Sequence, residues 1–195
     1  MTTKGNTIAT QGYQIIRELG HNRAGGRVTY LATNHSPPSD TGNDEVVVIK
    51  EFQFASASNG TWEIYEEYQR EIQVLQGLNH PGIPRYIDSF QTDAGFCLVQ
   101  EYKEAPPLSL SGSIWKPEQI KQIAIDILEI LSYLQNRLPP VIHRDIKPEN
   151  ILVTQHQNLA GEIVPATDKK QIDVYLVDFG FARIGQDPVA ISSMV

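Results

Sequence analysis

The amino-acid sequence predicts an α+β fold in which short strands come first and a long helix follows. Hydrophobic residues make up 41% of the 195 residues, and 14 glycines bring the apolar share to about 48%, which is typical of a globular domain that can bury a core. Strand-like alternation dominates the chain up to residue 102, with one helical stretch inside it, and the longest helical pattern comes after residue 116. Because the strands cluster early instead of alternating with helices, we expect an α+β arrangement.

Composition narrows the class of protein. The chain carries 16 Lys and Arg against 23 Asp and Glu, a net charge of −7, so a general nucleic-acid-binding role is not expected. Its one cysteine, Cys97, excludes an intrachain disulfide and a cysteine-based zinc site. No apolar run approaches the roughly 18 residues of a membrane span. Residues 1–12 lack the apolar stretch of a secretion signal, so we expect a cytoplasmic protein.

The elements of the first part follow from alternation and from turn residues. Residues 1–12 are expected to form a flexible tail, and residues 34–44, rich in Pro, Gly and Asp, a loop. A glycine-rich turn at 20–26 joins the first two strands into a hairpin. Strands are expected at 13–19, 28–32, 46–52, 85–91 and 96–102, and a helix with apolar residues at helical spacing at 62–78.

Two prolines, Pro106 and Pro107, mark the expected boundary between two parts of the chain. The second part begins with a helix over 117–136, which opens with Pro117, a residue suited to the first turn of a helix. Isoleucine and leucine residues occupy most of its circumference, so we expect this helix to be buried. Two short strands, at 151–153 and 174–177, are separated by a polar insertion.

Two charged residues stand among apolar ones. Lys50 shares a strand face with Val48 and Phe52, where an unpaired ammonium would be costly to bury. Glu71 falls in the middle of the apolar stripe of the next helix. Lys50 could instead reach water at a strand end, and the helix could have a different phase. Two anomalies of opposite sign nevertheless suggest each other, so we predict an internal Lys50–Glu71 ion pair.

The loop that follows the long helix gathers polar groups able to do chemistry. Residues 143–150 read His-Arg-Asp-Ile-Lys-Pro-Glu-Asn, and Pro148 disfavours a continued helix, so these groups lie on a loop. A carboxylate, a lysine and a carboxamide within six residues can serve as a base, a phosphate contact and a metal ligand. Asp178, at a strand end, is an oxygen ligand suited to Mg²⁺, although Asp178-Phe179-Gly180 alone could also be a plain turn.

On these residues the chain resembles the eukaryotic-like Ser/Thr protein kinases. The catalytic-loop pattern of that family, H-R-D-x-K-x-x-N, is matched in full by His143, Arg144, Asp145, Lys147 and Asn150. The D-F-G triplet at 178–180 is intact, residues 47–50 fit the V-A-I-K strand, and Glu71 fits the helix-borne partner of Lys50. Lysine at position 147 is the Ser/Thr-type pattern rather than the tyrosine-type one. The resemblance extends from residue 13 to about residue 180.

The resemblance implies a two-lobe, protein-kinase-like fold. Residues 13–102 would be the ATP-binding lobe, with an antiparallel sheet and one helix, and residues 103–195 a partial, mainly helical lobe. Asp145 and Lys147 would be catalytic, and Asn150 and Asp178 would hold Mg²⁺. The implied ATP-binding residues are Gly20, Asn22, Gly25, Gly26, Val28, Val48, Lys50, Glu71, Gln100, Glu101 and Tyr102.

Three departures from the family pattern stand out. Asn22 replaces the middle glycine of the glycine-rich loop, and either Gly25 or Gly26 serves as the third glycine. Since Asn tolerates a positive φ better than most residues, we expect this loop to be altered and not lost. Val48 replaces the usual alanine over the adenine and should crowd it slightly. The chain also stops at Val195, before the family's A-P-E motif and later helices.

The implied activity is transfer of the ATP γ-phosphate to a Ser or Thr hydroxyl of a protein substrate, with ATP and Mg²⁺ as cofactors. One alternative is a nucleotide-binding or scaffolding module that cannot phosphorylate because it is truncated. A small-molecule phosphotransferase of related fold is a third, which Lys147 and the D-F-G triplet argue against. Without the family's later helices, the helix over 117–136 would be about half covered. The expected outcomes are aggregation, dimerisation through that helix, or dependence on the missing continuation.

Overall fold

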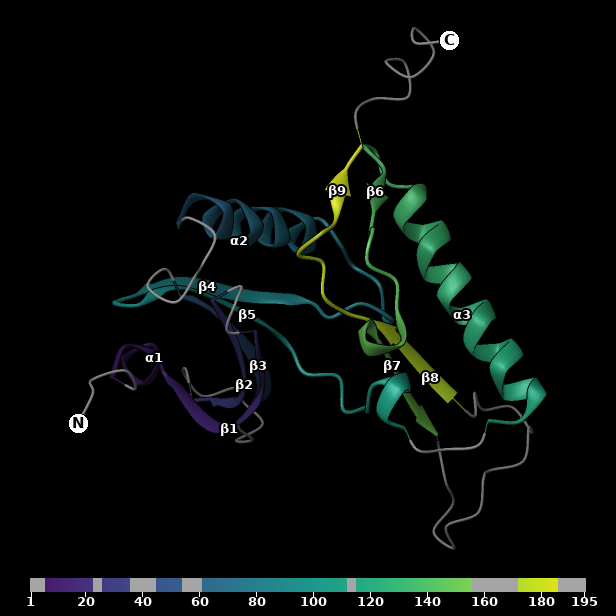
Figure 1. The fold of residues 1–195 in the computed structure, drawn as a ribbon, viewed down its shortest axis with the longest axis horizontal. Coiled ribbons are helices and arrows are strands. Elements are labelled where there is room, and N and C mark those ends of the chain that lie inside the picture. Colours follow the sequence, from purple (N-terminus) through teal and green to yellow (C-terminus); the bar gives the residue numbers. More distant parts are fainter. Residues whose placement is uncertain are drawn as a thin grey trace, which may run out of the picture. The chain divides into compact units, whose positions relative to one another are not determined.

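The computed structural model describes residues 6–22, 26–35, 45–53, 61–111, 115–155 and 172–185 (Figure 1). These residues divide into two compact units. The first unit comprises the described residues up to Gln76 together with Arg85–Tyr102. The second comprises Gly77–Pro84 and the described residues from Lys103 onward. The chain therefore enters the second unit at Gly77, returns to the first at Arg85 and enters the second again at Lys103. The sequence pattern does not predict this path.

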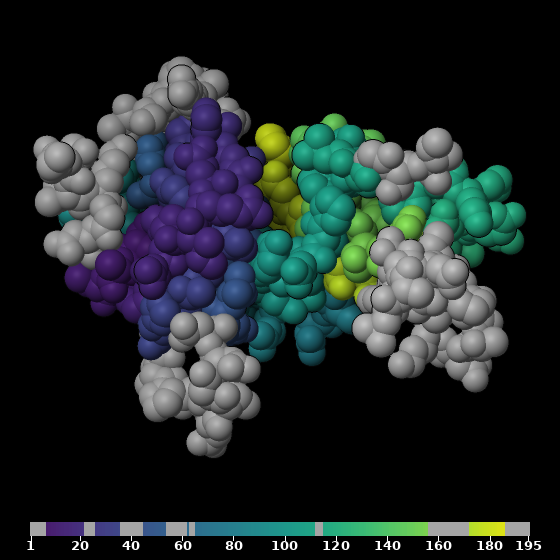
Figure 2. Space-filling view, turned by 90° about the horizontal axis from the view of Figure 1, so that it is seen from below, coloured from purple at the N-terminus to yellow at the C-terminus, as the bar shows by residue number. Residues whose placement is uncertain are grey.

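The first unit is built on an antiparallel sheet of five strands in the order β1-β2-β3-β5-β4. The strands are β1 (Tyr13–Asn22), β2 (Arg27–Asn34), β3 (Glu45–Gln53), β4 (Tyr86–Thr92) and β5 (Gly95–Glu101). In the space-filling view, the purple to blue residues of β1, β2 and β3 form one continuous surface (Figure 2). All five strands are predicted by the sequence, and the antiparallel order confirms the expected sheet.

One face of this sheet carries helix α2 (Thr61–Gln76), which contacts β3, β4 and β5. Aromatic rings fill the interface. The Tyr68 ring stacks on Phe96 with centroids 4.8 Å apart and meets the edge of Phe52 at 5.5 Å. Because Phe52 and Lys50 lie on the same face of β3, this packing also brings the lysine to the helix.

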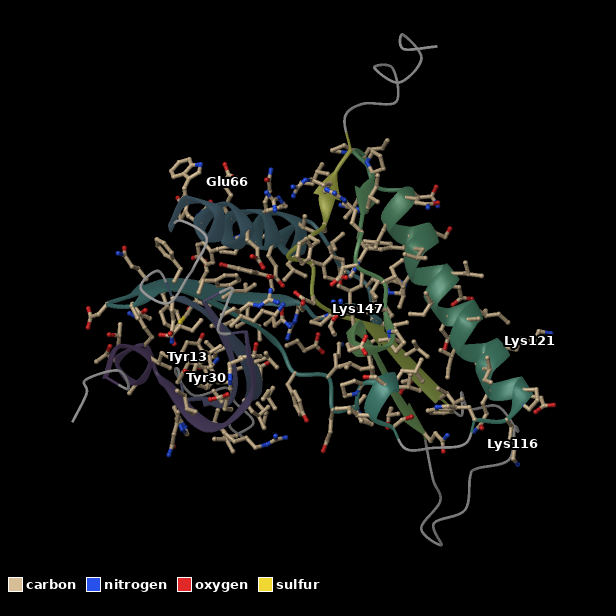
Figure 3. The ribbon with its side chains drawn as sticks, viewed as in Figure 1. Tyr13, Tyr30, Glu66, Lys116, Lys121 and Lys147 are labelled. Atoms are coloured by element: carbon tan, nitrogen blue, oxygen red, sulfur yellow. The ribbon has the colours of Figure 1, made fainter. Side chains whose placement is uncertain are left out.

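A short helix covers part of the opposite face. Helix α1 (Asn6–Thr10) places Ile8 in a buried apolar cluster. The other buried members of the cluster are Tyr13, Ala32, Val47, Ile49, Cys97 and Val99. Tyr13 and the neighbouring Tyr30, which packs against the cluster, are labelled in Figure 3. The described part of residues 1–12 is thus a packed helix and not the flexible tail that its polar sequence predicts, because Ile8 gains burial only from the folded sheet.

The hairpin between β4 and β5 requires a glycine. Thr92 Oγ1 accepts hydrogen bonds from the backbone N–H groups of Ala94 and Gly95, at 3.3 and 3.1 Å. Gly95 has a φ of 158°, and a Cβ at this position would come within 1.8 Å of the Phe52 carbonyl oxygen. Only glycine therefore lets the turn approach β3 this closely.

The second unit combines helix α3 (Pro117–Gln135) with two pairs of short antiparallel strands. β7 (Ile151–Gln155) pairs with β8 (Ile172–Leu176), and β6 (Val141–Ile142) pairs with β9 (Arg183–Ile184). Two short 3₁₀ helices complete it, η3 (Leu108–Leu110) and η4 (Pro148–Asn150). The sequence does not predict β6, β9, η3 or η4, since elements of two or three residues leave no periodic pattern.

The segment Gly77–Pro84 belongs to this unit because it bonds to α3 and β8. The backbone N–H of Asn79 donates to the Tyr133 hydroxyl at 2.7 Å, and Arg137 donates to the Gly77 carbonyl at 2.9 Å. The backbone N–H of Leu176 donates to the Gly82 carbonyl at 2.8 Å. These hydrogen bonds join residues far apart in the sequence, which is why no local pattern reveals them.

Helix α3 is buried on one face only, and not on nearly all sides as its composition predicts. It packs against β8 and β6 through Ile123, Ile127, Ile130 and Leu134. The adjoining face, with Ile120, Ile125 and Leu128, is exposed among the described residues. An apolar pattern records what a helix could bury, whereas actual burial depends on the elements that surround it. No helix in the described part of the chain is long and apolar enough to cross a membrane.

Candidate active site

The ion pair predicted inside the first unit is present. Lys50 Nζ donates to Glu71 Oε1, and the side chains are 7% and 0% exposed. Lys50 comes from β3 and Glu71 from α2, so the pair bridges the helix–sheet interface. The second carboxylate oxygen, Glu71 Oε2, is buried and has no hydrogen-bond partner among the described residues. A buried carboxylate must be compensated by a cation, and Lys50 supplies that charge.

The glycine-rich turn leaves β1 at Asn22 and returns at the start of β2. Gly26 is buried with a φ of 60°, and its carbonyl accepts a hydrogen bond from the Gln53 N–H at 2.6 Å. Gly25 lies outside the described residues. At Gly20 a Cβ would meet no atom of the described residues within 4 Å, so packing against them does not demand glycine there. Such a position is open to the close approach of another molecule.

The remaining predicted nucleotide contacts lie on three neighbouring strands. Val48 is buried and pairs with Gln100 of β5, which is also buried, and Val28 is half-buried on β2. The Glu101 carboxylate accepts from the Arg85 N–H at 3.1 Å, and its own N–H donates to the Arg85 carbonyl at 2.9 Å. Tyr102, half-buried, follows the end of β5.

His143 organises the loop over residues 143–150 of the second unit, a role that the sequence pattern alone does not assign. Its Nε2 lies 3.2 Å from the Val177 carbonyl, which can only accept, so Nε2 carries the proton. Nδ1 is then free to accept the backbone N–H of Asp145, at 3.3 Å. The buried imidazole also meets the Phe179 ring edge-on, with centroids 4.7 Å apart. One neutral histidine thereby links the loop to the strand end that precedes Asp178.

Asp145 is the centre of this loop's polar network. Its Oδ2 accepts from Lys147 Nζ at 2.7 Å and from Asn150 Nδ2 at 2.9 Å. The hydrogen bond to Asp145 raises the pKa of Lys147, and the nearby Asp178 and Glu149 carboxylates add to the effect, so the lysine stays charged at neutral pH. Figure 3 labels Lys147, which lies just before η4 and β7. The network fixes the carboxylate beside a permanent cation.

Two candidate metal ligands lie close to this network. The Asn150 amide nitrogen bonds Asp145, which leaves the carbonyl oxygen Oδ1, the atom that a hard cation prefers, turned away from those hydrogen bonds. The Asn150 carbonyl accepts from the Val177 N–H at 2.9 Å, and this bond ties the loop to the residue before Asp178. Asp178 has a φ of 66°, and Arg144 a φ of 70°. Such left-handed backbone at non-glycine residues is characteristic of functional sites.

The described residues contain no group of three or more His, Cys, Asp or Glu side chains placed to hold a metal. Asn150 and Asp178 alone supply too few ligands for a closed protein site. They do fit Mg²⁺, which keeps several waters and uses one or two carboxylates together with phosphate oxygens from the substrate.

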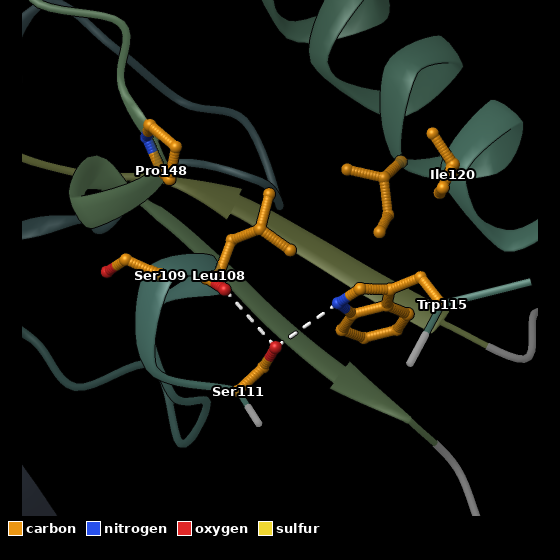
Figure 4. Close-up of a pocket in the computed structure, with 7 residues that line it drawn as sticks. Leu108, Ser109, Ser111, Trp115, Ile120 and Pro148 are labelled. Carbon is orange, nitrogen blue, oxygen red and sulfur yellow. Dashed lines mark hydrogen bonds between the residues drawn. The ribbon is translucent and has the colours of Figure 1, made fainter. Parts of the chain in front are cut away.

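A hollow of about 560 Å³ lies elsewhere in the second unit (Figure 4). Its apolar lining comes from Leu108, Trp115, Ile120, Ile123 and Pro148, and two serines complete it. Trp115 Nε1 donates to Ser111 Oγ at 3.2 Å, and that hydroxyl donates to the Leu108 carbonyl at 3.2 Å. The described residues that line it include no charged group and none of the predicted catalytic or nucleotide-binding residues.

Comparison with known proteins agrees with the motifs. The protein kinase domain model matches residues 13–195. Serine/threonine-protein kinases B and D of Synechocystis sp. are 31% and 32% identical over 97% and 96% of this chain, which covers 30% and 34% of those proteins. Serine/threonine-protein kinase 1 of Arabidopsis thaliana is 30% identical over 89% of this chain and is covered over 18% of its length.

The chain spans at most about a third of the length of these relatives. The family match itself covers far more than half of the chain. It includes the Lys50–Glu71 pair and the Asp145 network. The chain therefore belongs to the protein kinase domain family.

Proposed function

We propose that this chain is the catalytic part of a Ser/Thr protein kinase, which transfers the γ-phosphate of ATP to a Ser or Thr hydroxyl of a protein substrate. The observation that carries the proposal is the convergence of Lys147 and Asn150 on one oxygen of Asp145. A carboxylate held in this way, next to a fixed cation, suits a base that receives a hydroxyl proton. The names of the relatives and the lysine at position 147 support the Ser/Thr class.

In the first unit, Lys50 holds the α- and β-phosphates, and Glu71 keeps the ammonium in place. The backbone of the glycine-rich turn, including Gly20 and Gly26, covers the phosphates, and the open space found at Gly20 among the described residues supports this close approach. Val28, Val48 and the backbone of residues 100–102 enclose the adenine. Most of this contribution is positioning, because phosphoryl transfer needs little covalent chemistry from the protein.

In the second unit, Asp145 accepts the proton of the acceptor hydroxyl, and Lys147 balances the charge of the transferred phosphoryl group. Asn150 and Asp178 are the residues that would hold Mg²⁺, which when bound neutralises phosphate charge. His143 keeps Asp145 and Asp178 in a fixed relation through its bonds to both segments. The proposed reaction depends on residues of both units.

Calorimetric titration with MgATP tests the proposal. We expect Lys50→Met to weaken nucleotide binding and Asp178→Ala to remove its dependence on Mg²⁺. Lys121→Met, which removes an exposed lysine of α3, is the matched control and should leave both unchanged. Unaltered MgATP affinity in both site variants would rule out the assignment. Binding that responds as expected without any phosphorylation of a protein substrate would favour the scaffolding alternative.

A further inference from the structure

A second ion pair joins the same helix to the same sheet, and no motif in the sequence accounts for it. Arg27 Nη1 donates to Glu67 Oε1 at 2.8 Å, and the two side chains are 18% and 29% exposed. Both are partly shielded from water, so the pair interacts more strongly than one on the open surface. Arg27 lies next to the glycine-rich turn, and Glu67 lies one helical turn from Glu71, so both residues lie near the proposed nucleotide site.

Arg27 is the first residue after the glycine-rich turn. Its backbone pairs with Asn22 on one side and with Phe52 of β3 on the other. The preceding residue, Gly26, is fixed by the hydrogen bond from Gln53. The returning end of the turn is therefore anchored to β3 by its backbone, and the Arg27 side chain extends that anchoring to α2.

Glu67 lies four residues before Glu71, so the two carboxylates lie about one helical turn apart on the same side of α2. The register of the sheet matches this spacing. Arg27 pairs with Phe52, and two residues further along β2, Thr29 pairs with Lys50. Arg27 and Lys50 thus project from the same face of the sheet toward two carboxylates on one helix face. Tyr68, one residue after Glu67, packs on Phe52 of that sheet face.

We propose that Arg27 and Glu67 are positioning residues for the nucleotide site. Their ion pair ties the end of the glycine-rich turn to α2 and holds the helix in the rotation at which Glu71 reaches Lys50. Because α2 rotates as a rigid body, loss of the ion pair at Glu67 also shifts Glu71. A displacement of the glycine-rich turn reaches Glu71 by the same route, through Arg27 and Glu67. This inference rests on the proposed binding of ATP phosphates by Lys50.

The test measures the dissociation constant for MgATP by calorimetry on the whole chain. Arg27→Gln and Glu67→Gln should each raise the dissociation constant about fivefold, the lower end of the usual coupling between sites. The charge swap Arg27→Glu with Glu67→Arg should restore it to within about twofold, which also shows that the fold tolerates changes here. In a Glu71→Gln background, Arg27→Gln should add almost nothing, since its effect passes through Glu71.

Glu45→Gln is the matched control, because it removes an exposed ion pair in the same unit, Arg85–Glu45 at 3.3 Å. It should not alter the dissociation constant. Arg27 and Glu67 variants that lower the melting temperature but bind MgATP like the unaltered chain would overturn the inference, since a merely structural pair behaves in that way. An undiminished effect of Arg27→Gln in the Glu71→Gln background would also overturn it. Failure of Lys50→Met to weaken binding would instead refute the proposed function itself.

Discussion

The two units each contain a short lysine–carboxylate pair, and the pairs differ in how they are held. Lys50 and Glu71 come from two regular elements and are almost fully buried. Lys147 and Asp145 are two residues apart on one loop, and their side chains are 45% and 24% exposed. The first pair is positioned by helix–sheet packing, whereas the second is positioned by backbone hydrogen bonds and by His143.

This difference matches the work proposed for each pair. A group that only binds phosphate benefits from a rigid environment that excludes water. Its charge is then already in place, and no side chain or water has to rearrange when the ligand binds. A group that takes up and releases a proton must be reached by substrate and water in every cycle. We therefore expect the buried pair to matter most for stability and the exposed pair to matter most for turnover.

The largest effect we expect is on turnover in the second unit. Asp145→Asn should lower kinase activity by about 10²–10⁴-fold, because a positioned general base contributes that much. The side chain keeps its size and can still bond Asn150, so thermal stability and MgATP affinity should hardly change. Steady-state phosphorylation and calorimetry on the same preparation measure both. Near-normal turnover would remove Asp145 from its proposed role.

A stability effect of similar size is expected in the first unit. Glu71→Ala should lower the free energy of unfolding by about 3–5 kcal/mol, because it leaves Lys50 buried without its counter-charge. The double variant Lys50→Met with Glu71→Leu removes both charges and should regain most of that loss. Urea denaturation of the unaltered chain, the single variant and the double variant measures the three free energies of unfolding. A loss below about 1 kcal/mol in the single variant would mean that the pair is no better sheltered than the one in the loop.

The smallest effect is expected from the exposed pair. Lys147→Met should change the free energy of unfolding by no more than about 1 kcal/mol, as exposed ion pairs usually do. The pKa of Lys147 is raised, so the pair's contribution is complete below the ordinary lysine pKa of about 10.4 and disappears only as pH rises through the raised value. Between pH 7 and 9 the free energy of unfolding should therefore carry no pH dependence that comes from Lys147. A free energy of unfolding that changes clearly with pH in this range, and no longer does so in Lys147→Met, would contradict this prediction.

Much of the fold is predictable because its elements are long enough to show a period. The five strands of the sheet and the two long helices lie within a few residues of their predicted positions. Helix α1 is missed because one isoleucine among polar residues has no periodicity, and its burial depends on a sheet formed by later residues. The exposed face of α3 is missed for the opposite reason, since its apolar pattern does not depend on which neighbours are present.

The residues of the candidate site also fall into those that the sequence predicts and those that only the structure reveals. The Lys50–Glu71 pair is predictable since each residue violates the pattern of its own element, and the two charges are opposite. Arg27 and Glu67 violate nothing, because charged residues are ordinary both at the start of a strand and on a helix, so only the structure brings them together. The bonds of His143 to Val177 and Asp145 also depend on tertiary structure. The self-association predicted from the composition of α3 stays a prediction.

The burial of Cys97 gives this protein an internal chemical reporter. Its thiol is the only one in the chain, is inaccessible, and belongs to the apolar cluster that Ile8 completes. Burial raises the pKa of this thiol above its usual range, so the reactive thiolate is scarce while the cluster is closed. Modification by a thiol reagent at neutral pH therefore requires that α1 or the sheet beneath it opens first. The labelling rate, followed as denaturant is added, gives the free energy of that opening without any introduced probe.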